Sequence, residues 1–228
     1  MRQIPLVFFC CAVLFFACEN TTPTNAPVNA LSAQQVAAVP VQTLQGMYRN
    51  DAQGAFFYDC TAGETYQVET RPAGLDSTYR TLHQPPSYPG EPVFAVLHGK
   101  VITPNQGPTQ LVVTKVDTLI VRTLLNNCQP YDFWCIGTEP FWGLVISGSE
   151  GKIALKLIAE GQGKVFPWVQ PKQEGEFILY ESTDPETGEK IQVLLRKEPC
   201  SDGMSERMYP YSAKLKYGGQ MLQGCALK

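Results

Sequence analysis

Short runs of aromatic and β-branched residues, separated by turn residues, recur along the chain from about residue 44. Such runs are typical of β-strands. In the first half of the chain the expected strands are Gly46–Arg49, Ala55–Cys60, Thr65–Thr70, Pro92–Ile102 and Thr109–Ile120. Between the third and the fourth, apolar residues at i, i+4 and i+7 predict a helix over Leu75–Leu82.

Three strands, one helix and two strands follow one another in the order of an OB-fold barrel, in which a helix plugs the bottom between strands three and four. We therefore expect residues 44–128 to form a small, OB-like, five-stranded barrel with one helix. An SH3-like barrel or an open sheet remains an alternative.

A second strand pattern begins after the polar connector Asn126–Pro130, where we place a domain boundary. Residues 129–228 open with DFWCIGTEPFW and continue with four expected strands: Gly143–Ile146, Lys152–Leu157, Glu176–Tyr180 and Lys190–Arg196. The turn Asp184–Gly188 joins the last two. The predicted fold class is thus mainly β, with a second small antiparallel β domain that folds as a separate unit.

The N-terminus carries the features of an export signal. The 14-residue apolar stretch Ile4–Ala17 follows a basic Arg2. It is shorter than the roughly 20 residues of a membrane span and fits a secretory signal peptide over residues 1–17. Its Ala17-Cys18 end resembles the lipobox of bacterial lipoproteins, in which the cysteine is acylated after cleavage. An ordinary signal peptide with an incidental cysteine is the alternative. Residues 18–43 are polar and nearly uncharged, and predict a disordered tether.

Eight cysteines indicate an oxidising compartment. Five lie beyond the signal and lipobox: Cys60, Cys128, Cys135, Cys200 and Cys225. Their positions near the two ends of the first domain and in the two terminal motifs of the second lead us to expect Cys60–Cys128 and Cys200–Cys225 bridges. Cys135 is left as a buried apolar residue, a reactive thiol or a partner in an intermolecular bridge. A Cys128–Cys135 bridge would contradict this pairing.

Composition excludes several functions. The net charge is −3, so no basic surplus supports nucleic-acid binding. Only two histidines are present, and nucleophile-elbow, zincin, Walker and dinucleotide motifs are missing from the sequence. We therefore expect a protein that is not an enzyme and that has no cofactor and no metal site.

Five residues are weaker candidates for binding: Glu139, Trp142, Asp202, Met204 and Met208. The carboxylates accompany aromatic residues, and thioethers are ligands that Cu(I) prefers. The structural alternative is that the Phe-Trp pair of the motif EPFW fills the core, Glu139 caps a turn or accepts backbone N–H groups, and the methionines pack.

Two resemblances extend this interpretation. The runs Phe57–Val68 and Gly90–Val101, together with Leu75 and Tyr79, are similar to the OB-type domain of NlpE-like lipoproteins. That resemblance implies a non-enzymatic envelope lipoprotein of a group linked to copper tolerance and surface-stress signalling. Cysteine pairs at a spacing like that of Cys60 and Cys128 occur in that domain. The copper-associated CxxC of the group lies in a separate domain, and no CxxC follows the signal region here.

The motifs GTEPFW, CSDGMS, YP and GCA resemble an uncharacterised family of bacterial envelope proteins and, loosely, META/HslJ domains. Taken together, we expect a lipoprotein of the cell envelope, at the outer membrane, with a binding, sensing or structural role. Its partners would be the membrane, through the lipid anchor, and an envelope protein or small ligand, without nucleic acid. The alternatives are a copper-binding or small-ligand-binding lipoprotein and an inhibitor of a hydrolase such as lysozyme.

Overall fold

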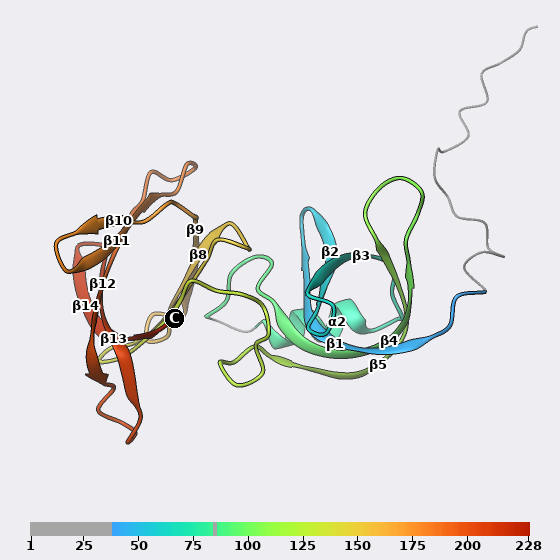
Figure 1. The fold of residues 1–228 in the computed structure, drawn as a ribbon, viewed down its shortest axis with the longest axis horizontal. Helices are drawn as coiled ribbons and strands as arrows, with labels where there is room; N and C mark the ends of the chain where they lie inside the picture. Colours follow the sequence, from blue (N-terminus) through green and yellow to red (C-terminus); the bar gives the residue numbers. More distant parts are fainter. Residues whose placement is uncertain (1–37, 84–85) are drawn as a thin grey trace, which may run out of the picture. The chain divides into compact units, whose positions relative to one another are not determined.

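A computed structural model of the chain describes residues 38–83 and 86–228 (Figure 1). The expected signal peptide, the expected acylation site Cys18 and most of the expected tether therefore lie outside the described residues. Within the described ranges, no helix combines the length and the apolar character that crossing a bilayer requires.

The first five strands form a closed barrel in the order β1-β2-β3-β5-β4. The elements are β1 Gln42–Asp51, β2 Gly54–Asp59, β3 Glu64–Thr70, α2 Leu75–Leu82, β4 Val93–Ile102 and β5 Gln110–Val121. β1 pairs antiparallel with β4, and β3 pairs parallel with β5, which closes the barrel. The predicted OB-like barrel with one helix is confirmed. β1 begins at Gln42, two residues before the expected start of the domain.

The barrel core follows from alternation along the strands. In β2 the residues Ala55, Phe57 and Asp59 point inward, while Phe56 and Tyr58 are only partly buried. The helix adds Leu75 and Tyr79 to the same core cluster.

The remaining strands form a nine-stranded antiparallel sheet in the order β10-β11-β12-β13-β14-β6-β7-β8-β9. Their bounds are β6 Phe133–Thr138, β7 Phe141–Ser147, β8 Lys152–Leu157, β9 Gln162–Pro167, β10 Lys172–Glu174, β11 Phe177–Thr183, β12 Lys190–Ser201, β13 Met208–Tyr217 and β14 Gln220–Leu227. The sheet curls so that β11 approaches β9, and the Ser182 hydroxyl of β11 donates to the Pro167 carbonyl of β9 across 2.7 Å. The second antiparallel β unit is thus confirmed, with a core cluster that shares no residue with that of the barrel.

Two disulfides join the pairs expected from the sequence. Cys60 and Cys128 have Cα atoms 5.5 Å apart, and Cys200 and Cys225 have Cα atoms 5.6 Å apart. The first bridge ties the turn that follows β2 to the connector, and the second ties β12 to β14. Cys135 is a buried free cysteine, and burial raises the pKa of its thiol well above the ordinary value. A buried, protonated thiol fits packing better than reactivity.

Replacing both Cys200 and Cys225 by Ala should lower the free energy of unfolding by up to about 3.5 kcal/mol, because the loop they close is about 26 residues long. Urea unfolding of the oxidised proteins measures the change. Cys135→Ala serves as the control, since it removes a thiol without opening a bridge. An unchanged urea midpoint in the double variant would contradict a bridge at this position.

Candidate functional site

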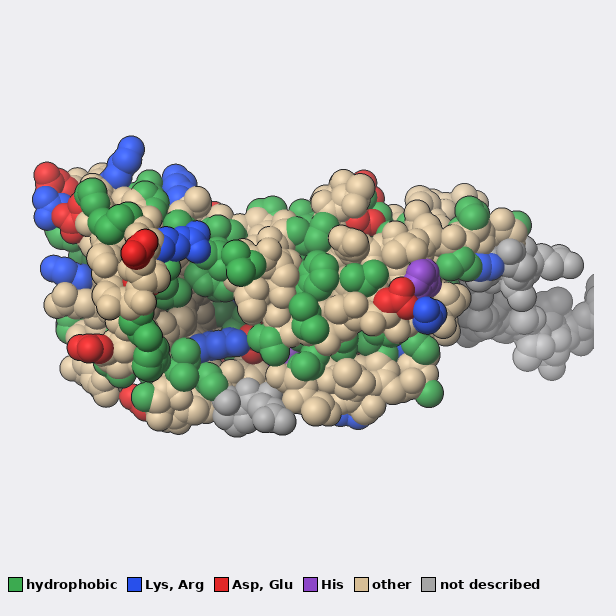
Figure 2. Space-filling view, turned by 90° about the horizontal axis from the view of Figure 1, so that it is seen from below, with side chains coloured by type: hydrophobic (Ala, Val, Ile, Leu, Met, Phe, Trp, Pro, Cys, Tyr) green, Lys and Arg blue, Asp and Glu red, His purple; other side chains and the backbone are tan. Residues whose placement is uncertain are grey.

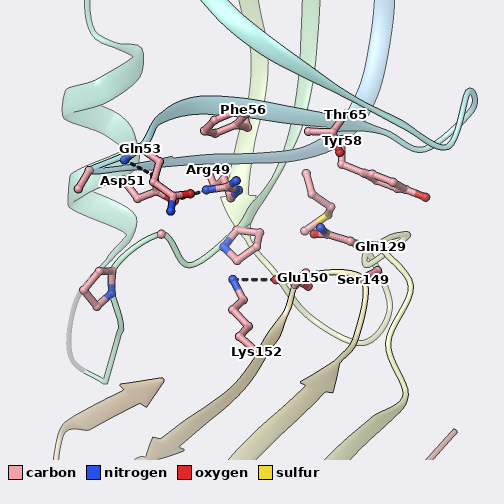
Figure 3. Close-up of a pocket in the computed structure, with 15 residues that line it drawn as sticks. Arg49, Asp51, Gln53, Phe56, Tyr58, Thr65, Gln129, Ser149, Glu150 and Lys152 are labelled. Atoms are coloured by element: carbon pink, nitrogen blue, oxygen red, sulfur yellow. Dashed lines mark hydrogen bonds and ion pairs between the residues drawn. The ribbon is translucent and has the colours of Figure 1, made fainter. Parts of the chain in front are cut away.

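A cavity of about 410 Å³ lies on the outer surface of the barrel (Figure 3). Its barrel wall comes from β1, the β1–β2 turn and β2. The residues that matter most there are Arg49, Asp51, Phe56 and Tyr58. This volume lies within the roughly 300–1,000 Å³ of small-molecule sites.

The barrel wall is held in place by contacts among its own side chains. The Arg49 guanidinium lies 4.2 Å from the centre of the Phe56 ring and forms an ion pair with Asp51. Asp51 also accepts the backbone N–H of Gln53 at 2.8 Å. Gly90 has a φ of +69°, and a Cβ atom there would come 2.8 Å from the Asp51 carboxylate. Glycine is therefore needed for the segment after α2 to pass this close to β1.

The opposite wall comes from the β7–β8 turn and the connector, and contains Ser149, Glu150, Lys152 and Gln129. Figure 3 shows Glu150 and Lys152 joined to each other on the side of the cavity opposite Arg49 and Phe56. Lys152 Nζ lies 2.7 Å from Glu150 Oε2, as an ion pair outside hydrogen-bond geometry. The Gln129 Oε1 atom is buried and has no hydrogen-bond partner.

Glu150 is ionised despite its burial. Its side chain is 4% exposed, and burial alone would raise the pKa of its carboxyl. Arg122, whose Nη1 donates to Glu150 Oε1 across 3.0 Å, and Lys152 together hold this pKa below its ordinary value. The cavity therefore has two internal ion pairs, and its charges balance.

Surface charge is mixed as well. On the face shown in Figure 2, the described acidic and basic side chains are scattered among hydrophobic and polar ones, with no single basic patch. Such a surface offers little electrostatic attraction for a polyanion.

None of the five candidate binding residues from the sequence lines the barrel cavity. Three of them, Glu139, Asp202 and Met204, line a groove of about 960 Å³ in the second unit, beside the β6–β7 turn and the loop between β12 and β13. Trp142 and Met208 do not line this groove. Glu139 is exposed and makes no hydrogen bond to a described residue, so it caps no turn as the structural alternative expected. Phe141 is 48% exposed, and its expected place in the core is therefore wrong.

Trp142 is a core residue rather than a binding residue. It is 1% exposed, and its indole N–H donates to the Gln223 carbonyl across 3.2 Å. A Cβ atom on Gly137 or Gly224 would overlap its ring. The glycines of the GTEPFW and GCA motifs thus make room for this tryptophan.

Asp202 organises its own loop. Its carboxylate accepts the backbone N–H groups of Met204 and Ser205 at 3.0 and 2.9 Å, and the Tyr209 hydroxyl at 3.2 Å. The hydrogen bonds from Met204 and Ser205 hold the pKa of the carboxyl below its usual range. This is the chemistry of a structured turn.

The methionines do not gather into one cluster. Met204 and Met221 line the groove of the sheet, whereas Met208 lines a different hollow beside Pro199 and Tyr209. In the part of the chain that the structure describes, no three His, Cys, Asp or Glu side chains are grouped so that they could hold a metal ion.

One arrangement was not anticipated from the sequence. His98 on β4 lies between Thr43 and Asp117, with Nδ1 3.1 Å from the Thr43 hydroxyl and Nε2 2.5 Å from the Asp117 carboxylate. The hydrogen bond from Lys115 lowers the pKa of Asp117 most, and the hydrogen bond from His98 lowers it further. Thr43 and Asp117 are exposed and His98 is partly buried. These side chains line none of the described pockets and stabilise neighbouring strands as cross-strand partners.

The barrel cavity was also missed. Its aromatic residues could have been noticed, because a period of two places Phe56 and Tyr58 on the face opposite Phe57. Glu150 of the second wall follows Asp51 of the barrel wall by about one hundred residues in sequence, and no local pattern links the two walls.

The closed barrel and the Cys60–Cys128 bridge mark the extent of one OB-like unit. A comparison with known families finds a match over the same part of the chain. Residues 38–128 match the NlpE C-terminal OB domain. The match ends at the disulfide cysteine Cys128. The META/HslJ-like character of residues 129–228 stays a prediction. No curated protein and no solved structure matches the chain.

Proposed function

We propose that this protein is a non-enzymatic lipoprotein of the cell envelope with a binding or sensing role at the membrane surface. The observation that carries the proposal is the match of residues 38–128 to the NlpE C-terminal OB domain. The lipobox-like Ala17-Cys18 and the two disulfides are consistent with export to an oxidising compartment. In this proposal, domains 44–128 and 129–228 fold as separate units on a tether that starts at acylated Cys18.

The barrel cavity is the feature that favours binding over a purely structural role. It combines aromatic and proline surfaces with charged groups. Its volume of about 410 Å³ lies in the range of small-ligand sites. Copper binding has less support, since Met208 lies apart from Met204 and Met221.

Replacing Cys18 by Ser should abolish metabolic labelling with a palmitate analogue and leave either a soluble form or an uncleaved form of the protein, because acyl chains on Cys18 would attach the mature protein to the membrane. Cys11→Ser in the same apolar segment is the matched control and should leave labelling unchanged. Cleaved Cys18→Ser protein that still sediments with membranes would show that the anchor is assigned wrongly.

A further inference from the structure

We propose that the groove in the second unit is a docking site for a segment of another protein that carries both basic and apolar side chains. The proposal gives the proposed binding role a surface and a class of partner, and it rests on that role. The groove, of about 960 Å³, is lined by residues between 136 and 224, so the site belongs to the nine-stranded sheet and not to the barrel. Three features support the proposal: exposed apolar side chains, carboxylates without ion-pair partners, and fixed walls.

Large apolar side chains from three different segments are exposed in the groove. Phe141 at the start of β7, Met204 in the loop between β12 and β13, and Met221 on β14 are between 48% and 68% exposed. Ile158, which is also exposed, lies next to them, because its backbone N–H donates to the Phe141 carbonyl across 3.0 Å. Exposed apolar patches bordered by polar residues mark interaction surfaces, and aromatic residues and methionine are enriched there.

The strand pattern shows that the core does not require these apolar side chains. On β7, Trp142 follows Phe141 and is buried. On β14, Leu222 follows Met221 and is buried as well. Because successive residues on a strand point to opposite faces, Phe141 and Met221 lie on the face away from the core. Polar residues at these two positions would suit the same strands, so the apolar side chains favour a contact with another molecule.

The charge of the groove favours a basic partner. Glu139, Glu198 and Asp202 line it, and of the described residues in the lining only Lys214 is basic. Glu198 is paired with Arg196. Asp202 accepts hydrogen bonds from N–H and O–H groups that carry no charge, and Glu139 forms no hydrogen bond or ion pair with a described residue. Two carboxylates are thus free to pair with lysine or arginine side chains of a partner, which gives electrostatic complementarity.

The walls of the groove are fixed before a partner binds. The Thr138 hydroxyl donates to the Asp202 backbone carbonyl across 3.0 Å, and this bond ties the loop between β12 and β13 to the end of β6. The Cys200–Cys225 bridge joins β12 to β14. A surface that is already ordered loses little conformational freedom on binding, so more of the contact free energy appears as affinity.

Other occupants fit these features less well. The phosphate groups of an anionic bilayer or of a nucleic acid would meet three carboxylates, and like charges repel. A small cation alone would leave the apolar side chains in contact with water. A protein segment with basic and apolar side chains contacts both kinds of group, and the flexible methionine side chains can adapt to its shape.

The test is binding of the fluorescent octapeptide KLLKKLLK to the full chain in non-ionic detergent, with empty micelles as the background. In this peptide, lysine and leucine both occur on each face of an extended strand. The peptides ELLEELLE and KSSKKSSK lack the basic or the apolar side chains, and each should bind about tenfold more weakly. Fluorescence anisotropy measures the dissociation constants.

Substitutions in the groove should weaken binding of KLLKKLLK. Phe141→Ser should weaken it about tenfold, because a central aromatic contact is lost. Glu139→Gln should weaken it about threefold, because one exposed ion pair is lost. Leu125→Ser and Glu186→Gln are the matched controls, since both residues are exposed and neither lines the groove. Circular dichroism checks that all variants keep the β fold.

Methyl NMR of the methionines locates the bound peptide independently. KLLKKLLK should shift the signals of Met204 and Met221, which line the groove. The signals of Met47, which lines the barrel cavity, and Met208, which lines a different hollow, should stay unchanged. These two methionines therefore serve as internal controls.

The proposal is supported if KLLKKLLK binds, the two groove variants weaken binding, the control variants do not, and Met204 and Met221 shift. Absence of binding, equal binding of ELLEELLE or KSSKKSSK, or shifts confined to Met47 or Met208 would overturn it. Shifts of Met204 and Met221 that grow with protein concentration without peptide would show that a second copy occupies the groove, and would also overturn it. The assay does not depend on acylation of Cys18 in cells, so its failure is distinguishable from failure of the proposed function.

Discussion

Gly137→Ala should lower the free energy of unfolding by on the order of 4 kcal/mol, an unusually large effect for a single methyl group. The new Cβ atom would overlap the indole ring of Trp142, which donates to the Gln223 carbonyl from a fully buried position. The ring cannot move away easily, because Gly224 packs against it and would itself overlap it if it carried a Cβ atom. Urea unfolding measures the loss.

Gly143→Ala is the matched control for this prediction. Gly143 lies next to Trp142 on β7, but a Cβ atom there would meet nothing within 4 Å. Alanine at this position should leave stability unchanged or raise it slightly, because it restricts the unfolded chain. In a Trp142→Phe background the smaller ring should reduce the cost of Gly137→Ala. Equal stability of the two alanine variants would contradict a packing role for Gly137.

The pattern of the sequence predicted the order of strands and helix in the barrel, because β2 and β4 alternate regularly and the helix shows a clear apolar face. It left an SH3-like barrel and an open sheet as alternatives. The sequence also contained the information that would have placed Phe141 correctly, outside the core. Adjacent residues on a strand point to opposite faces, so Phe141 and Trp142 cannot both enter one core. With Trp142 buried, Phe141 must lie toward solvent, and it is 48% exposed.

Other parts could not be derived from local pattern. β9, with the sequence QGKVFP, contains Gly163 and Pro167 and has no clear alternation. It becomes a strand because β8 offers it a pairing edge. The cavity forms only because Asp51 and Glu150 come together in one site. These residues belong to segments far apart in sequence, so no local pattern shows that they meet.

The buried ion pair behind the cavity illustrates the same dependence. Arg122 and Glu150 have side chains that are 3% and 4% exposed, with 3.0 Å between Arg122 Nη1 and Glu150 Oε1. Arg122 Nε also donates to Asn127 Oδ1 across 2.9 Å, and the guanidinium lies 5.3 Å from the centre of the Trp134 ring. The pair thus joins the end of β5 to the β7–β8 turn, and its geometry also positions Glu150 in the cavity wall.

Arg122→Met should lower the free energy of unfolding at neutral pH by about 3–5 kcal/mol, because it leaves the Glu150 carboxylate buried and without its main partner. Lys172→Met is the control, since Lys172 forms its ion pair with Glu181 on the exposed surface and should change stability little. A double variant, Arg122→Met with Glu150→Leu, removes both charges and should recover much of the loss. Equal destabilisation by the single and double variants would contradict the ionic explanation.

The effect of Arg122→Met should depend on pH in a defined direction. In the folded protein the pKa of Glu150 is held below its ordinary value of 4.5, so its ionised form stabilises the fold above that pH. This contribution is lost as the pH falls through the folded pKa.

In Arg122→Met, burial instead raises the pKa of Glu150, and protonation in acid relieves the free-energy penalty of the buried carboxylate. The stability difference between wild type and variant should therefore narrow as the pH falls below about 4.5, and urea unfolding across that range measures it. A difference that stays constant or widens in acid would show that Arg122 stabilises the fold through packing on Trp134 rather than through Glu150.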